Sequence, residues 1–257
     1  MVAIATARAL PAQVAPNRSA VYLFPSDVQD TRALWVNPAA LAILREASVG
    51  FDVTVGNPGA LGRLEQFTLG LNSRGLSFGY QRDIFDNGVR GNTYRIGLAG
   101  ASHGLAAGAA AALYRGQTSE LGWEFGLTYM PQPMFRFAAV LVNVGAPVVR
   151  GFKQETGLVP SITFIAPAAG LSASAMGTVL GGPAAYAFGL AWRATGSLPL
   201  GLLARMDTDG SLRRGAFAFG LSFGRGDQAG LVGTTPGDLS SVDAATLYGV
   251  SSRSPSR

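Results

Sequence analysis

Three features of the sequence predict an all-β fold, namely an antiparallel transmembrane β-barrel of about 14 strands with a short N-terminal helical plug. The first feature is an alternation of apolar residues with small or polar ones, which begins at 47–56 and recurs almost to the C-terminus. The second is an alternation of short and long connections between these segments. The third is a composition with 48% hydrophobic but only 14% charged residues, which is little charge for the surface of a soluble domain.

The residues before the strand pattern divide into two predicted parts. Residues 1–16 resemble the later part of a secretory signal peptide, with a short apolar run and a small-residue cleavage pattern. Residues 17–46 contain the helix-like part of the chain: Asn37 is a good N-cap, Pro38 suits the first helical position, and Ala39–Arg45 are good helix formers. We expect about two helical turns here, and a helix this apolar has to be covered by other residues.

Residues 47–250 contain the segments that we expect to form the barrel wall, and 251–257 are expected to be a tail. In 47–56 the odd-numbered residues are apolar and the even-numbered ones small or polar, so an extended chain would have one apolar face. The further strands are predicted at 64–72, 75–82, 92–100, 104–114, 120–130, 134–144, 158–166, 171–179, 184–193, 199–206, 215–224, 229–234 and 242–250. The outward set includes Leu69, Phe78, Ile96, Phe125, Leu190 and Phe219.

The connections between these segments indicate how the barrel is oriented. Those after every second strand are short, as at Ser73–Arg74 and Ala101–His103, whereas 83–91, 145–157 and 207–214 are longer. Bacterial barrels have an even number of strands, with short periplasmic turns and longer outer loops. We therefore expect the N-terminus on the periplasmic side. The weak strand at 229–234 is needed to reach an even number of strands.

The composition indicates that the apolar face meets lipid. Mean hydropathy is +0.26, yet no stretch reaches the roughly 18 apolar residues of a transmembrane helix. A water-soluble barrel or sandwich is the alternative, but its small-residue face would then be a surface with very few Lys, Glu or Asp. The net charge of +5 is carried almost wholly by arginine. It reflects either codon composition or contact with anionic lipid headgroups; the scattered arginines argue against nucleic-acid binding.

A short motif before the first strand resembles the N-terminal signature of the FadL family of outer-membrane proteins. The segment reads Trp35-Val36-Asn37-Pro38-Ala39-Ala40-Leu41-Ala42, and the Asn-Pro-Ala-x-Leu core consists of Asn37, Pro38, Ala39 and Leu41. This family includes long-chain fatty acid and aromatic hydrocarbon transporters and the PorV-type barrels of type IX secretion. The resemblance implies that roughly residues 17–46 form a plug inside the barrel. The chain departs from the transporters in its short length and in lacking a terminal aromatic residue.

Charged residues at predicted inward positions are the candidates for a site in the lumen. They are Asp52, Arg95, Glu124, Arg136, Arg193 and Arg205. One role is a network that holds the plug and stiffens the wall. The other is a selectivity element in which arginine binds an anionic headgroup such as a carboxylate. Inward Val140, Val142, Met176 and Leu203 would make the lumen partly apolar, which suits a hydrophobic solute better than an ion.

The sequence shows no catalytic or metal-binding constellation, and we predict a protein that is not an enzyme and has no cofactor. The single histidine, His103, follows Ser102 in a predicted turn. Adjacent side chains usually point apart, so we expect no nucleophile–base pair there. The chain has no cysteine, which excludes disulfides and thiolate metal sites. Residues 207–210 resemble the start of a calcium loop but lack its later ligands, and we expect a turn.

These observations lead to one expected function and two alternatives. We expect a barrel of the bacterial outer membrane, in contact with its lipids, that passes or holds small hydrophobic molecules while residues 17–46 gate the lumen. The first alternative is a PorV-like barrel that anchors or shuttles secreted proteins or binds a secretion system. The second is a soluble β-rich binding protein.

Overall fold

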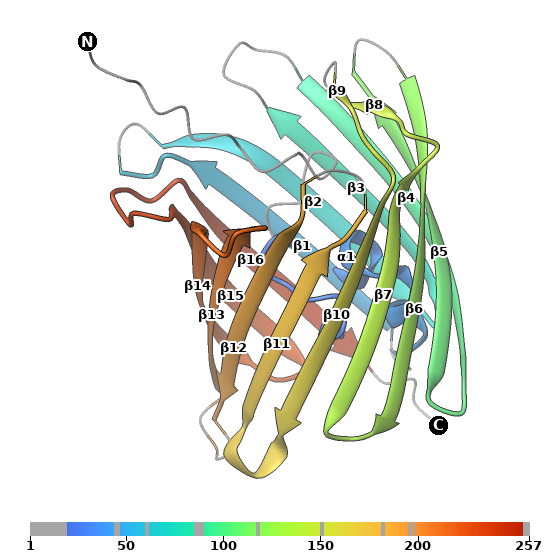
Figure 1. The fold of residues 1–257 in the computed structure, drawn as a ribbon, viewed down its shortest axis with the longest axis vertical. Coiled ribbons are helices and arrows are strands. Elements are labelled where there is room, and N and C mark those ends of the chain that lie inside the picture. The colour runs from blue at the N-terminus through green and yellow to red at the C-terminus, as the bar shows by residue number, and fades with distance from the viewer. Residues whose placement is uncertain are drawn as a thin grey trace.

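A computed structural model shows a closed antiparallel barrel of fourteen strands, as predicted (Figure 1). It describes residues 20–43, 47–59, 62–84, 90–116, 119–149, 152–180, 183–194, 197 and 199–253. The barrel strands are β1 (Ala47–Gly56), β2 (Arg63–Ser73), β3 (Leu76–Ile84), β4 (Arg90–Ser102), β5 (Leu105–Arg115), β6 (Ser119–Gln132), β7 (Phe135–Val144), β10 (Gly157–Ala166), β11 (Leu171–Thr178), β12 (Ala185–Arg193), β13 (Leu200–Asp209), β14 (Arg214–Gly224), β15 (Asp227–Pro236) and β16 (Ala244–Arg253). The predicted signal segment 1–16, residues 17–19 and 44–46 of the predicted plug, and residues 254–257 lie outside the described residues.

The weak strand predicted at 229–234 is the ten-residue β15, which pairs with β14 and β16. Strand β16 continues to Arg253, so the wall extends beyond residue 250, where we expected it to end. The extension follows from pairing, because Ser251 lies opposite Asp227 and the Arg253 guanidinium forms an ion pair with the Asp227 carboxylate. A short 3₁₀ turn, η2 (Pro167–Ala169), joins β10 to β11.

The two faces of the wall have the predicted character. The outward residues Leu69, Phe78, Ile96, Phe125, Leu190 and Phe219 are between 43% and 58% exposed. The inward residues that alternate with them, such as Thr68, Ser77 and Glu124, are buried. Among the described residues, no helix has the length and apolar character to span a membrane.

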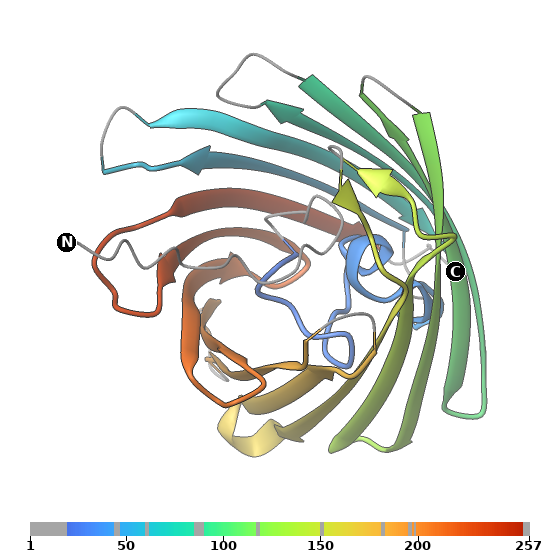
Figure 2. The same ribbon diagram turned by 45° about the horizontal axis from the view of Figure 1, so that its top comes forward.

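Residues 20–43 lie inside the ring of strands, and we call them the lumenal segment (Figure 2). It consists of turns, one α-helical turn, α1 (Ala33–Val36), and the 3₁₀ helix η1 (Pro38–Ala42). Asn37 caps η1 as predicted, because its side chain accepts a hydrogen bond from the Ala39 N–H at 3.1 Å. The expected two-turn helix is wrong. A residue before proline is held out of the α region, and Asn37 is accordingly extended at φ −157°, which ends α1 and starts a separate short helix.

Glycines in the wall allow the lumenal segment to touch the barrel backbone. Helix η1 contacts β4, β5 and β6. A Cβ atom on Gly108 of β5 would lie 2.5 Å from the Pro38 carbonyl oxygen, and one on Gly126 of β6 would lie 2.9 Å from the Ala39 nitrogen. The small inward residues therefore form a seat that is shaped to the backbone of η1.

The connection between β7 and β10 contains a hairpin, formed by β8 (Val148–Val149) and β9 (Phe152–Lys153), that the sequence did not predict. Figure 1 shows it at the end of the barrel that carries the long connections. Val149 is buried against Ala112 and Tyr114, which lie on the inward face of β5. The hairpin therefore turns toward the lumen and narrows this mouth of the barrel.

Replacing Gly108 by alanine tests the backbone seat. We expect Gly108→Ala to lower the free energy of unfolding by about 1–3 kcal/mol, because the added methyl group overlaps the Pro38 carbonyl. Gly100→Ala on β4 is the matched control, since its Cβ would meet no atom within 4 Å. Guanidinium titration of both variants in lipid vesicles measures the difference. Equal stabilities would contradict a tight contact at Gly108.

Candidate functional site

The lumenal segment lies between two cavities. The short-turn cavity, of about 490 Å³, lies between the segment and the wall from β7 to β16, and reaches the turns at Gly170 and Arg225. The long-connection cavity, of about 70 Å³, lies toward the other end of the barrel and is lined by residues such as Trp35 and Met176. Leu23 lines both cavities, so the chain at this residue is the partition between them.

The partition is fastened to the wall by Arg205 of β13. Its guanidinium donates a hydrogen bond of 2.9 Å to the Leu23 carbonyl oxygen and lies 5.0 Å from the centroid of the Phe24 ring. Asp207 accepts two hydrogen bonds from the same guanidinium, at 2.7 and 2.9 Å, and so fixes its direction. A Cβ atom on Gly189 would lie 2.7 Å from Phe24 Cζ, so the ring packs directly against the backbone of β12. One arginine and one glycine thereby position the partition.

A buried ion pair holds the α1 end of the segment. Arg95 of β4 donates to both carboxylate oxygens of Glu124 of β6, at 2.8 and 2.9 Å, and both side chains are almost fully buried. The same guanidinium donates to the Leu34 carbonyl at 3.2 Å and lies 4.8 Å from the Trp35 ring centroid. A bidentate pair fixes the plane of the Arg95 guanidinium, so that one of its N–H groups points at the Leu34 carbonyl.

Asn37 is the most completely bonded residue of the predicted plug motif. Its Nδ2 donates to the Pro25 carbonyl and to Thr128 Oγ1 of β6, each at 2.8 Å. Its Oδ1 accepts the Ala39 N–H, so one fully buried amide joins two parts of the segment to the wall. The other motif residues, Pro38, Ala39 and Leu41, are also buried. Removing such an amide would leave several buried polar groups without partners.

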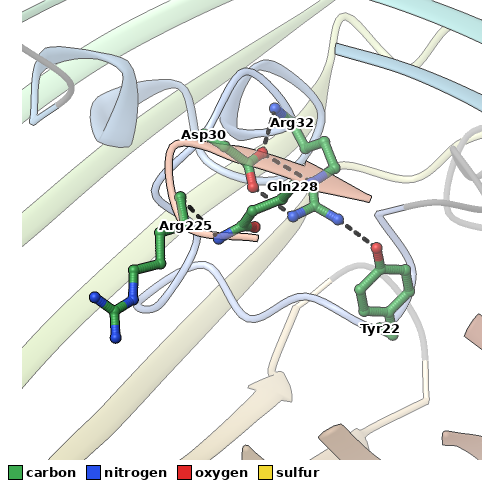
Figure 3. Close-up of polar contacts among 5 residues, drawn as sticks. All are labelled: Tyr22, Asp30, Arg32, Arg225 and Gln228. Atoms are coloured by element: carbon green, nitrogen blue, oxygen red, sulfur yellow. Dashed lines mark hydrogen bonds and ion pairs between the residues drawn. The ribbon is translucent and has the colours of Figure 1, made fainter. Parts of the chain in front are cut away.

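Arg32 organises the part of the segment that borders the short-turn cavity. Its guanidinium forms an ion pair with Asp30 and donates to the Tyr22 hydroxyl (Figure 3). It also lies 4.3 Å from the ring centroid of Tyr248 on β16. Burial penalises the charge of Asp30, but attraction to Arg32 outweighs it and the pKa of this carboxyl lies below its usual value. Figure 3 also shows the β14–β15 turn beside this group, where the Gln228 side chain donates to the Arg225 carbonyl at 3.3 Å.

A second acidic residue of the segment, Asp27, reaches the wall at Arg136 of β7. The two groups are 3.3 Å apart and both are partly exposed to the cavity. Burial raises the pKa of the Asp27 carboxyl, and the nearby guanidinium offsets only part of this effect. Next to it, Ser26 Oγ lies 2.7 Å from Ser161 Oγ and from Thr163 Oγ1 of β10. This side of the segment is therefore joined to the wall by one partly exposed ion pair and by buried hydrogen bonds between small hydroxyl groups.

The structure places the six predicted lumen residues in three settings. Arg95, Glu124, Arg136 and Arg205 contact or hold the lumenal segment. Asp52 is buried on β1 near Thr31 and Arg32. Arg193 lines the short-turn cavity and is exposed. Sequence reasoning missed Ser26, Asp30 and Arg32, because their segment has no periodicity from which an orientation could be read.

The contact between Ser102 and His103 differs from the expectation. Ser102 Oγ and His103 Nδ1 are 2.7 Å apart, whereas we expected adjacent side chains to point apart. His103 has a φ of +51°, and this left-handed conformation swings the ring back toward Ser102. The pair is exposed in the β4–β5 turn, and no carboxylate of the described residues accepts from the ring, so the oriented base of a catalytic triad is not formed.

The expectation that residues 207–210 form a turn is wrong, because residues 207–209 are the end of strand β13 and the connection to β14 consists only of residues 210–213. Asp209 Oδ1 accepts hydrogen bonds from the N–H groups of Ser211 and Arg213, at 2.8 and 2.9 Å, and Asp207 binds Arg205. Within the described part of the chain, no group of three or more His, Cys, Asp or Glu side chains is arranged to hold a metal ion.

Two solved structures have the same fold at low sequence identity. The toluene transporter TbuX of Ralstonia pickettii matches with a TM-score of 0.56 and 15% identity, over 89% of this chain and 96% of that one. The outer membrane protein Omp33 of Acinetobacter baumannii matches with a TM-score of 0.51 and 10% identity, over 80% of this chain and 95% of that one. No protein-family model and no curated protein sequence matches the chain. At these identities the likeness concerns the fold.

Neutralising Glu124 tests the buried ion pair. We expect Glu124→Gln to lower the free energy of unfolding by about 3–5 kcal/mol, because Arg95 is left buried without its counter-ion. The partly exposed Asp27–Arg136 pair gives the control. We expect Asp27→Asn to lower the free energy of unfolding by at most about 1 kcal/mol. Guanidinium titration compares the two variants. A loss for Glu124→Gln no larger than that for Asp27→Asn would contradict a structural role for the buried pair.

Proposed function

We propose that this protein is a FadL-like barrel of the bacterial outer membrane that passes small hydrophobic molecules, and that the lumenal segment gates their passage. The observation that carries the proposal is the position of Leu23 between the two cavities, which lie toward opposite ends of the barrel. A solute that crosses the barrel through these cavities has to displace the chain at this residue.

The outer face of the barrel supports placement in a membrane. Its exposed side chains are large and apolar along almost every strand. Tyr94, Trp123, Tyr129 and Trp192 are exposed near strand ends, where aromatic residues lie at the interface between lipid and water. Most connections at one end are short, as at 103–104 and 225–226, and the other end has longer ones, as at 145–156 and 237–243, although 194–199 and 210–213 depart from this alternation. This arrangement fits the periplasmic and outer sides of such barrels. The fold shared with Omp33 and TbuX agrees with this placement.

The strength of the contacts indicates which part of the segment moves. The part around Asn37 is buried and fully bonded, and the Arg95–Glu124 pair holds α1. The part around Leu23 and Ser26 is attached to the wall by the Arg205 hydrogen bond, by two neutral hydrogen bonds of Ser26 and by the partly exposed Asp27–Arg136 pair. A charge-assisted hydrogen bond contributes about 1.5–3 kcal/mol and a neutral one about 1 kcal/mol, and a partly exposed ion pair contributes at most about 1 kcal/mol. We therefore expect residues 20–28 to be the part that leaves the wall when a solute passes, while residues 33–42 remain in place.

The lining of the passage suits a small solute with an apolar body. Leu23, Phe24 and Leu203 line the short-turn cavity, and Trp35, Val142 and Met176 line the other one. TbuX, which shares the fold, is a toluene transporter, and small aromatic hydrocarbons are therefore a reasonable first class of solute to test here. No observation favours anchoring of secreted proteins, and that role stays a prediction of the sequence.

A disulfide between the segment and the wall tests the gate. The chain has no native cysteine, and Ser26 Oγ lies 2.7 Å from Ser161 Oγ. In oxidised Ser26→Cys/Ser161→Cys protein the segment is fixed to β10. We expect uptake of the hydrophobic dye N-phenylnaphthylamine by expressing cells to fall to that of cells without the protein. Reduction with dithiothreitol should restore it.

The two single cysteine variants are the controls and should keep the wild-type uptake in both redox states. The extent of cross-linking is read from the gel mobility of the unfolded protein before and after reduction. Wild-type uptake by fully cross-linked protein would refute gating by this segment. Deleting residues 20–43 is an independent measurement, and we expect it to raise dye uptake.

Arg193 tests whether a cation in the short-turn cavity selects the solute. Among the described residues its guanidinium donates no hydrogen bond, although it is close enough to Asp27 and Asp30 to affect their charge. We expect Arg193→Gln to slow uptake of an aromatic carboxylate while leaving the uptake of toluene unchanged, because only the carboxylate gains from the charge. Equal effects on both solutes would contradict a selective role.

A further inference from the structure

Three polar residues form a row on the outer face of the wall, close to the long connections. Arg82 of β3 lies opposite Asn92 of β4, and Asn92 lies opposite Arg115 of β5. Arg115 is exposed and Arg82 is partly exposed. All three alternate with outward apolar residues of their strands, such as Phe78 and Ile96. The row therefore faces the surroundings of the barrel and not its lumen.

The row is arranged to bind an anion. The Cα atoms of Arg82 and Arg115 are separated by two strand spacings, about 10 Å, which both guanidinium groups can bridge. Between them, the Tyr80 hydroxyl donates to Asn92 Oδ1 at 2.8 Å and leaves the Asn92 amide N–H groups as donors. Within the described part of the chain, neither guanidinium forms a hydrogen bond or an ion pair, and Asn92 Nδ2 has no acceptor.

Two acidic residues at the same strand ends, Asp83 and Glu120, point away from this row. Asp83, which follows Arg82, is buried and accepts hydrogen bonds from Gln66 and Gln81 on the lumen side. Glu120 of β6 lies opposite Tyr114, which is an inward residue of β5. The outward row thus carries two positive charges, and no described carboxylate forms an ion pair with either of them.

The level of the row on the barrel identifies the kind of anion. The rings of Tyr80 and Tyr94 pack at 5.3 Å and lie opposite each other one inward–outward repeat below Arg82 and Asn92, about 7 Å along the strands. Paired tyrosines at this position mark the boundary between lipid tails and headgroups. The arginines accordingly lie at the headgroup level on the side of the long connections, above apolar residues that can cover acyl chains.

We propose that Arg82, Asn92 and Arg115 form a binding site for the phosphate of an anionic glycolipid in the outer leaflet. The inference rests on the proposed placement in the outer membrane. Arginine provides forked donors that match phosphate oxygens, and the Asn92 amide adds a neutral donor between the two charges. The apolar wall around Phe78 and Ile96 covers the acyl chains of the same molecule.

Native mass spectrometry and affinity titration of the purified full-length barrel in detergent test this site. The probes are lipid A, dipalmitoyl phosphatidylglycerol and inorganic phosphate. We expect wild-type protein to prefer lipid A over both other probes. Each single variant, Arg82→Gln and Arg115→Gln, should weaken lipid A binding about fivefold, and the double variant about thirtyfold, since each arginine at a membrane surface contributes a similar amount.

Arg214→Gln is the matched control, because Arg214 is an exposed arginine at the same end of the barrel but on β14, far from the row along the sheet. It should bind lipid A within about twofold of wild type. Unchanged binding by the double variant, or an equal loss in Arg214→Gln, would overturn the site. Equal affinity for phosphatidylglycerol would overturn the assignment to a glycolipid. Dye uptake is measured separately from lipid binding. A protein that binds lipid A but takes up no dye would contradict the proposed transport and leave the lipid site standing.

Discussion

The closure of the sheet by β1 and β16 is the constraint on which the rest of the structure depends. Residue pairs from Ala47–Arg253 to Gly56–Ala244 join these strands along the whole length of β1, so the sheet has no edge with unpaired N–H and C=O groups. Such groups would cost several kcal/mol each in contact with lipid. Closure also fixes which side chains face inward. It therefore creates a lumen whose lining is set residue by residue, and which the chain fills with its own residues 20–43.

The carbonyl groups of the lumenal segment need hydrogen-bond donors, and side chains of the wall provide some of them. The lumenal segment is mostly turns, so many of its carbonyl groups have no partner within a helix. Side-chain donors fill this gap: Arg95 binds the Leu34 carbonyl and Arg205 binds the Leu23 carbonyl. Asn37 does the same for the Pro25 carbonyl from within the segment. The inward charges are thus the donors that an irregular buried chain requires, and this explains why arginine is preferred there.

The sequence predicted the wall far better than its contents. Strand positions follow from a local period of two, so even the weak strand β15 was found, and the same parity gave the inward charges such as Arg95 and Glu124. Strand ends were less accurate, because pairing with a neighbour extends β16 to Arg253. The fold of the lumenal segment, the β8–β9 hairpin and the Ser102–His103 contact depend on tertiary packing or on a positive φ. No periodic pattern records these features.

The outward arginines indicate where the apolar face of the wall ends. An unpaired guanidinium in the middle of an apolar band would be costly, and cations on the lipid face of barrels become tolerable only near the interfaces. Arg82 lies near the end of β3 and Arg115 is the last residue of β5, and both are at the end with the long connections. The paired rings of Tyr80 and Tyr94 mark the same boundary by a different chemistry. In the proposed membrane placement, two independent preferences agree at this level of the wall, so the lipid headgroups would lie here and the charge of the arginines would be available to a phosphate.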